Sequence, residues 1–252
     1  MALQIVVIAE ARADYLVTSH LVDRTVLESA STPSWLTEDP PLLEQERHYC
    51  GLDPESDFSE RRKMKAKSAG FGKKQAVFVG KFGSRKSMPS DMWDTKRCIE
   101  NTVISCPNCD ALILSRDSDG DEERVDSWYK TAEESQPHVN FTIIIAGQIC
   151  KLEAWILNGF EPQNNSEAAA LKEVRTRLGF SPVIQSERLT ARSAGAKKDA
   201  KQILDKLAIS YDRKEKCWQQ TDLGTLNTNG QGSGLSRYLT DVSEKILPLF
   251  SW

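Results

Sequence analysis

Residues 111–121 read Ala-Leu-Ile-Leu-Ser-Arg-Asp-Ser-Asp-Gly-Asp, an apolar run that leads straight into a cluster of carboxylates. Consecutive apolar residues predict a strand buried on both faces of a sheet. Alternate residues of an extended chain point the same way, so Asp117 and Asp119 can face one ion together. Gly120 removes a side chain where the backbone must turn. The stretch therefore predicts a divalent-metal site at the end of a buried strand.

Two plainer interpretations of this cluster remain beside the metal site. The first is a solvated acidic turn in which Asp121 caps the following helix, because carboxylates stabilise helix N-termini. The second is a calcium loop of the EF-hand type. The segment before the cluster is a strand, however, and the loop lacks glycine and glutamate in the required register. A helix cap thus remains the better interpretation of Asp121.

Polar residues also follow two other apolar segments of the chain. Residues 3–9 predict a buried strand that Glu10 follows, and residues 139–147 predict another that leads to Gln148 and then Glu153. Buried strands that alternate with helices indicate an α/β fold with a parallel-rich sheet. Functional groups collect outside the carboxyl ends of such strands. We therefore expect these polar residues to converge with the acidic cluster at one edge of the sheet.

Such a convergence suits a hard cation. Mg²⁺ prefers oxygen ligands and keeps several waters, so two or three carboxylates suffice to bind it. We expect Mg²⁺, or Mn²⁺ in its place, at this edge. Plainer interpretations exist here too: Glu153 as a surface carboxylate of a helix, and Trp155 as an ordinary core residue.

The remaining pattern is mainly helical. A helix is expected to begin near Asp14, with Asp14 as its N-cap. Further helices are predicted at 121–135, 166–178, 194–208 and 235–247, with a loop at 224–234. Residues 92–105 begin with a helical pattern that then becomes unclear. Residues 31–60 are rich in proline and serine and predict a loop or an insertion.

Two motifs of this chain resemble those of the Toprim fold, the metal-binding domain of topoisomerases, primases and several nucleases. They are Val-Val-Ile-Ala-Glu around Glu10 and Leu-Ile-Leu-Ser-Arg-Asp-Ser-Asp-Gly at 112–120. The sequence Glu-Ala-Trp at 153–155 matches a signature of small stand-alone bacterial Toprim-like proteins suspected in conflict with phages. Ala11 is a departure, because the family often has glycine directly after the first glutamate.

The resemblance implies a Toprim/Rossmann-like parallel-rich sheet flanked by helices, with an inserted basic segment and a helical C-terminal part. Residues 1–160 would form the metal-binding domain, with an insertion at about 31–105. Residues 161–252 would form a mainly helical extension packed on the same core.

The resemblance also implies roles for individual residues. Asp117 and Asp119 would bind Mg²⁺, and Glu10 would be a further ligand or a general base. Glu153 would serve a second metal or support the ligands of the first. Lys197 would offset charge on the transition state, with Lys198 and Lys201 as alternatives.

The activity implied is metal-dependent cleavage of phosphodiester bonds in DNA or RNA, by the effector of a bacterial anti-phage defence system with an ATPase partner. One alternative is a non-catalytic Toprim-like adaptor or sensor bound to that ATPase. Another is a nucleotide-binding or phosphotransfer enzyme on a similar sheet.

A basic stretch at 61–86 carries no acidic residue, although the formal net charge of the chain is -3. Basic residues interleaved with aromatic ones can follow a phosphate backbone and stack on bases. A solvated insertion, or a contact site for an acidic protein, would have the same composition. The candidates for binding nucleic acid are Lys63, Lys65, Lys73, Lys74, Arg85 and Lys86.

No apolar run reaches the length of a membrane span, and the N-terminus has no basic region that would indicate a signal peptide. We therefore expect a cytoplasmic protein that does not bind membranes; a homo-oligomer is compatible with the sequence. The six cysteines are expected to be reduced. Cys106 and Cys109 have the spacing of half a zinc site, which His48 and Cys50 could complete if the chain folds back.

Overall fold

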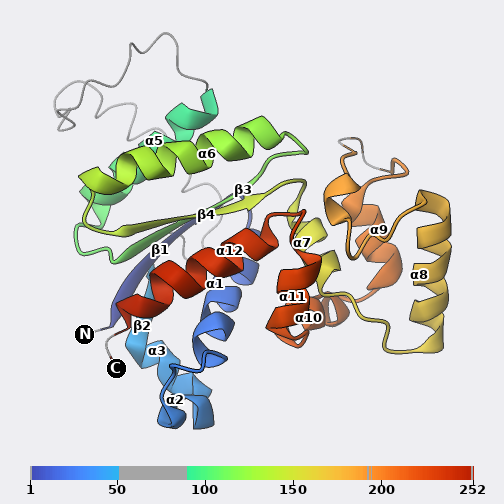
Figure 1. The fold of residues 1–252 in the computed structure, drawn as a ribbon, viewed down its shortest axis with the longest axis horizontal. Helices are drawn as coiled ribbons and strands as arrows, with labels where there is room; N and C mark the ends of the chain where they lie inside the picture. Colours follow the sequence, from blue (N-terminus) through green and yellow to red (C-terminus); the bar gives the residue numbers. More distant parts are fainter. Residues whose placement is uncertain (1, 51–89, 192, 194, 251) are drawn as a thin grey trace.

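The described residues form a parallel four-stranded sheet with helices around it, which confirms the predicted α/β class (Figure 1). The computed structural model describes residues 2–50, 90–191, 193, 195–250 and 252. The strands are β1 (Leu3–Ala9), β2 (Arg47–Cys50), β3 (Ala111–Asp117) and β4 (Thr142–Gln148). Their order across the sheet is β2-β1-β3-β4, and every pair is parallel.

The three longer strands are apolar on both faces because helices cover the sheet on both sides. On β1, Ile5 and Val7 belong to one apolar core, whereas Val6 belongs to another. On β3, Ile113 and Leu112 divide in the same way. This alternation follows from the two-residue period of a strand. It also fixes which side chains reach each face at the strand ends.

Figure 1 shows α1 (Arg12–Leu27) and α12 (Leu235–Asp241) on one face of the sheet, and α5 (Ser90–Ser105) and α6 (Glu122–Ser135) on the other. The larger core lies on the α1 face and includes apolar residues of the C-terminal helices. The expected C-terminal helical part is therefore present. Among the described helices, none combines the length and the apolar character needed to cross a bilayer.

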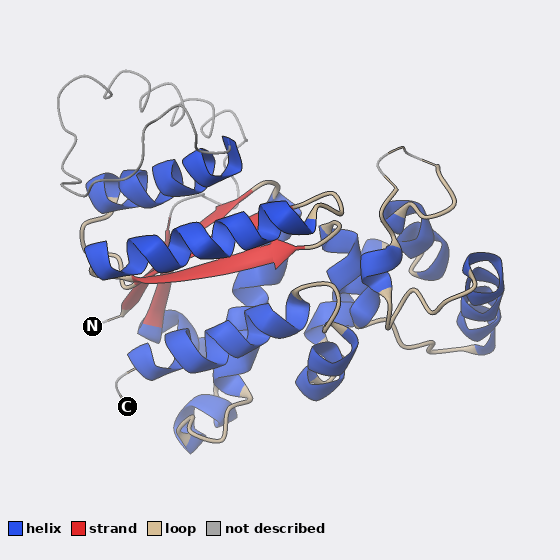
Figure 2. Ribbon diagram, turned by 45° about the horizontal axis from the view of Figure 1, so that its top comes forward, coloured by secondary structure: helices blue, strands red, loops and turns tan. Residues whose placement is uncertain are grey.

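The remaining helices lie mostly beside the sheet (Figure 2). The α-helices are α2 (Ser34–Glu38), α3 (Leu43–Glu46), α7 (Leu152–Asn158), α8 (Asn165–Leu178), α9 (Ala200–Leu207), α10 (Tyr211–Gln219) and α11 (Leu223–Asn229). Short 3-10 or π segments are η1 (Pro40–Leu42), η2 (Gln136–His138), η3 (Ser186–Arg188), η4 (Val242–Ile246) and η5 (Leu247–Leu249).

Several boundaries differ from the sequence prediction, and helix caps explain two of them. The helix expected from residue 194 begins at Ala200, where the Asp199 side chain accepts a hydrogen bond from the backbone of Lys201. The expected loop at 224–234 contains α11, because Asp222 Oδ2 accepts from Thr225 N at 2.8 Å. The Asp199 cap thus fixes a later helix start than predicted, and the Asp222 cap starts a helix in spite of neighbouring glycine and asparagine. Helix α10 was not predicted.

Strand β2 and helix α5 lie inside the interval that the sequence predicts as an insertion. Arg47 of β2 makes a two-pronged ion pair with Asp23 of α1, with N–O distances of 2.9 and 2.8 Å. Tyr49 also donates to Ser19 O of α1. These contacts hold β2 at the sheet edge. The candidates for nucleic-acid binding lie outside the described residues: Lys63, Lys65, Lys73, Lys74, Arg85 and Lys86.

Trp155 is a core residue, as its plainer interpretation held. Its side chain is 1% exposed and stacks on Tyr238 of α12, with ring centroids 5.3 Å apart. Its indole nitrogen donates to Ser233 O at 2.9 Å. Trp155 therefore joins α7 to the C-terminal helices.

Trp155→Ala should destabilise the protein by about 3–5 kcal/mol, because it removes a buried indole and leaves a cavity. Urea denaturation would measure the change. Trp35→Ala is the matched control, because Trp35 is 44% exposed, and it should cost well under half as much. Equal losses in the two variants would contradict the assigned packing.

Candidate functional site

The candidate site lies where the order of the strands reverses. From β1 the chain first builds β2 on one side and then returns to build β3 on the other. The carboxyl ends of β1 and β3 are neighbours, with Ala9 level with Ser115. Glu10 follows β1 directly, and Asp117 is the last residue of β3. In open parallel sheets this reversal point is where ligands bind.

The turn after β3 is held against the end of β4 by backbone hydrogen bonds. Ser118 N donates to Gln148 O, Asp119 N to Cys150 O and Gly120 N to Ile149 O, at 2.7 to 3.1 Å. Asp119 has a φ of 55°, in the left-handed region that few residues other than glycine adopt. The alternation argument for the Asp-x-Asp pair is thus corrected: Asp117 belongs to the strand, but a strained turn positions Asp119.

Two buried oxygen atoms at this edge have no hydrogen-bond partner among the described residues: Asp117 Oδ1 and Gln148 Oε1. The two residues are level with each other on β3 and β4. The Gln148 amide nitrogen donates to Asp14 Oδ1 at 3.0 Å and to Ser115 Oγ at 3.1 Å. Because buried acceptors are normally satisfied, the pair needs a donor or a cation.

The charges of four other carboxylates act on Asp117, and we call the five together the carboxylate cluster: Glu10, Asp14, Asp117, Asp119 and Glu153. Burial raises the pKa of Asp117 to about 8, and repulsion from Asp14, Glu10, Glu153 and Asp119 adds to the effect. The residues that the sequence analysis placed at these strand ends thus act on one another through their charges, whereas their shared metal site stays a prediction. A cation here would offset the repulsion.

Asp14 is a member of the cluster that the sequence prediction missed. Ala11, not Asp14, is the N-cap residue of α1, and Ala11 N donates to Asp14 Oδ2 at 2.9 Å. Burial raises the pKa of Asp14 to about 6, although its hydrogen bonds with Gln148 and Ala11 lower it. The four-residue spacing between Glu10 and Asp14 was the available signal, because it places both near one helix start.

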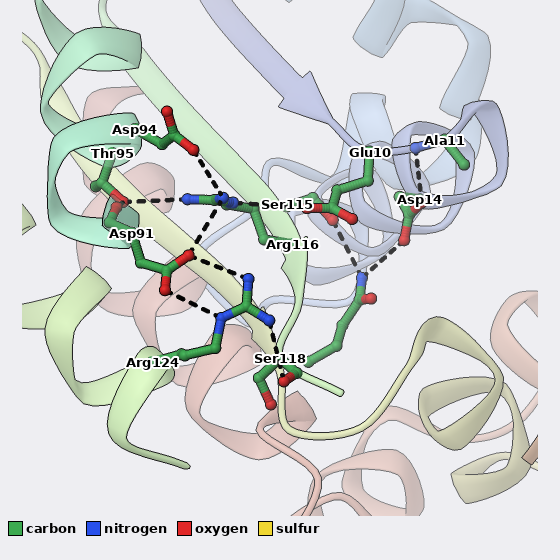
Figure 3. Close-up of polar contacts among 11 residues, drawn as sticks. Glu10, Ala11, Asp14, Asp91, Asp94, Thr95, Ser115, Arg116, Ser118 and Arg124 are labelled. Carbon is green, nitrogen blue, oxygen red and sulfur yellow. Dashed lines mark hydrogen bonds and ion pairs between the residues drawn. The ribbon is translucent and has the colours of Figure 1, made fainter. Parts of the chain in front are cut away.

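Glu10 forms an ion pair with Arg116, an arginine on the other face of the sheet (Figure 3). Arg116 Nε lies 3.6 Å from Glu10 Oε1, and Arg116 Nη2 lies 3.9 Å from a carboxylate oxygen of both Asp91 and Asp94. Arg116 precedes Asp117 on β3, so the two side chains point to opposite faces. Glu10 is therefore shared between Arg116 and the carboxylate cluster.

A second arginine supports the turn from the α6 side. Arg124 makes two hydrogen bonds to Asp91, at 3.1 and 3.2 Å, and donates to Ser118 O at 3.3 Å. The Asp121 side chain accepts from Arg124 N, which confirms Asp121 as the cap of α6. Figure 3 shows Asp91 between the two arginines.

Three lysines were predicted to offset charge on the transition state, and they lie in a loop near Gly120 or directly after it: Lys197, Lys198 and Lys201. Thr190 and Asp199 form an antiparallel bridge, and a Cβ on Gly120 would lie 3.2 Å from Thr190 Cγ2. Lys197 is exposed on this loop, and among the described residues no hydrogen bond or ion pair joins it to a carboxylate. Lys198 Nζ lies 5.9 Å from the centroid of the Phe180 ring.

The oxygen donors of this edge suit a hard cation. In the described part of the chain, no three His, Cys, Asp or Glu side chains are grouped to hold a metal. The charge of Glu10 is already balanced in part by the ion pair with Arg116. Asp117 Oδ1 and Gln148 Oε1 are nonetheless unpaired oxygens of the kind that Mg²⁺ binds.

The cysteines named for a zinc site lie near one another on the α5 face. Cys50 Sγ is 3.7 Å from Cys106 Sγ, far beyond the length of a disulfide bond, and all described cysteines are free. Burial raises the pKa of Cys50 and Cys109 to about 12, so both thiols are protonated at neutral pH. Protonated thiols are poor nucleophiles, in keeping with the expectation of reduced, ordinary cysteines.

Asp117→Asn should stabilise the metal-free protein at pH 8 by roughly 1–3 kcal/mol, which would raise the melting temperature by several degrees. The folded-state pKa of Asp117 lies above its ordinary value. The native state therefore binds more protons than the unfolded state between those values, and stability falls as pH rises.

Thermal melts in EDTA between pH 5 and pH 8 would measure this effect. The parent should lose stability over this range, and Asp117→Asn should lose less. Asp126→Asn, a change at an exposed position of α6, should follow the parent. A lower melting temperature for Asp117→Asn at pH 8 would contradict the repulsion.

Comparisons of the chain with protein-family models, with curated proteins and with solved structures find no match.

Proposed function

We propose that the protein is a Mg²⁺-dependent nuclease of the Toprim type that cleaves phosphodiester bonds in nucleic acid. The main support is the pair of unpaired buried oxygens, Asp117 Oδ1 and Gln148 Oε1, together with the four carboxylates whose charges act on Asp117. A protein that keeps uncompensated charge of one sign at a ligand-binding edge loses stability there. A cation that binds the native state restores that stability, which explains why the carboxylates are kept together.

In this proposal Asp117 and Asp119 hold the metal ion, with Gln148 and Glu153 beside them. Mg²⁺ supplies Lewis-acid polarisation of the phosphate when it is bound. Glu10 accepts the proton of the attacking water. Arg116, whose Nε lies 3.6 Å from Glu10 Oε1, offsets the negative charge of the carboxylates and the phosphate at this edge. Lys197 stays a candidate for the same task, because its loop borders Gly120.

The biological setting is proposed from the resemblance alone. Small Toprim-like proteins without an ATPase domain often act with an ATPase partner, and we propose such a partner in a cytoplasmic bacterial anti-phage module. This part rests on analogy between folds. DNA and RNA are both compatible with a site whose metal ion binds the phosphate group.

The competing function is a non-catalytic adaptor or sensor bound to the ATPase. One contact favours it: Glu10 is paired with Arg116, so a cation would have to compete with an internal guanidinium. Ala11 in place of the family glycine points the same way. The two functions differ in whether the carboxylate cluster binds a metal at all.

Asp117→Asn and Asp119→Asn should each lower Mg²⁺-dependent cleavage by roughly two orders of magnitude or more, the cost of losing one electrostatic group of a catalytic site. The assay would offer plasmid, single-stranded DNA and tRNA with Mg²⁺ or Mn²⁺. Asp126→Asn is the control and should cut as the parent does. Cleavage by Asp117→Asn at the parental rate would refute the mechanism.

Mg²⁺ should raise the melting temperature of the parent at pH 8, because a ligand that binds only the native state stabilises it by about 2.7 kcal/mol at 100 times Kd. Asp117→Asn should show a much smaller shift. Differential scanning fluorimetry with increasing MgCl₂, and with KCl at matched ionic strength, measures this. The adaptor function instead predicts no shift beyond that of KCl.

A further inference from the structure

A cavity of about 190 Å³ lies between α1, α7, α9 and α10. It is larger than the cavity of about 150 Å³ that accommodates benzene in an engineered protein core, so one aromatic ring fits. Most of its lining is apolar or aromatic. These side chains are Leu16, Val17, Leu152, Ile156, Leu204 and Trp218.

The cavity adjoins the carboxylate cluster. Glu153 is part of its wall, and the charge of Glu153 also acts on Asp117 and Asp14. Ala13, which precedes Asp14 on α1, lines the cavity as well. A ligand with one end at the carboxylate cluster can therefore place its next group in the cavity.

The mouth combines an aromatic ring with positive charge. Tyr211 lines the cavity and is 58% exposed, and nearby Ile209 is 87% exposed. Lys214 also lines it but is paired with Asp205 at 2.5 Å. Lys201 is exposed, and its ammonium has no hydrogen bond or ion pair with any residue that the structure describes. Lys201 is therefore available to a phosphate.

We propose that this cavity receives an unpaired nucleobase of the nucleic acid whose backbone lies at the carboxylate cluster. The inference rests on the proposed nuclease function and names its substrate class as single-stranded or locally unpaired nucleic acid. Apolar walls and an aromatic ring suit the flat faces of a base, and a free lysine suits the adjoining phosphate. A base inside a duplex cannot enter such a cavity without leaving its stack.

A partner protein is the less favoured occupant. An apolar side chain of a partner would use the walls of the cavity but neither the exposed Lys201 nor the connection to the carboxylate cluster. A nucleotide uses all three features, because it carries a base and a phosphate within one unit. The cavity therefore fits a nucleotide better than an apolar peptide.

Fluorescence anisotropy tests this with a labelled single-stranded oligonucleotide and the matching duplex, in MgCl₂ and on the Asp117→Asn background to prevent cleavage. The single strand should bind at least about tenfold tighter than the duplex. Adding Tyr211→Ala should weaken single-strand binding by roughly 5- to 150-fold, the range that corresponds to the loss of one base–aromatic stack. Duplex binding should not change.

Two further variants sharpen the test. Lys201→Gln should weaken binding and reduce the slope of log K against log salt by about 0.7, the value for one phosphate contact on a single strand. Trp35→Ala removes an exposed aromatic of α2, distant in sequence from the cavity, and should bind as the background does.

The outcomes separate this inference from the nuclease proposal. Equal binding of single strand and duplex, with no effect of Tyr211→Ala, would overturn the cavity assignment, while Asp117-dependent cleavage could still stand. Single-strand binding that depends on Tyr211, without cleavage by the parent, would support the cavity and refute the nuclease. A background variant that binds neither nucleic acid, together with a parent that cleaves neither, would refute both.

Discussion

The repulsion among carboxylates at the reversal point of the sheet is the constraint on which the rest of the candidate site depends. Asp117 ends a strand that begins with four apolar residues, and four more carboxylates act on it. The protein gains no stability from this grouping. It is maintained by surrounding structure: the sheet behind it, the turn bonded to β4, and the hydrogen bonds of Gln148 and Ala11 to Asp14. Such a cost is typical of sites kept for function.

The cations of the site are kept on one side of the sheet and the unpaired oxygens on the other. Arg116 and Arg124 share Asp91 on the α5–α6 face, whereas Asp117 and Gln148 face α1. Glu10 lies at the boundary and interacts with both sides. This separation follows from the alternation of side chains along β3. It lets one strand contribute a guanidinium and a carboxylate at neighbouring positions without direct neutralisation.

The sequence was sufficient to predict the elements whose apolar residues form a continuous run or a regular period. Strands β1, β3 and β4 could be inferred, because buried parallel strands are continuous apolar runs. Other features depend on contacts distant in sequence. Strand β2 is held by an ion pair to α1, Asp119 by a turn bonded to β4, and Asp14 joins the site through Gln148, 134 positions away. A local sequence pattern cannot indicate partners that are distant in sequence. Helix α10 was missed for another reason: it has few apolar residues, so its sequence shows little helical periodicity.

The packing of α12 has a consequence for the order of events during synthesis. The Tyr238 hydroxyl donates to Thr18 O of α1, although the two residues are 220 positions apart, and Tyr238 stacks on Trp155 of α7. The helices that carry Asp14 and Glu153 are thus both completed by a segment made late. Contacts of such long range form slowly. The carboxylate cluster therefore takes its final form only after α12 has been synthesised and has packed against α1 and α7.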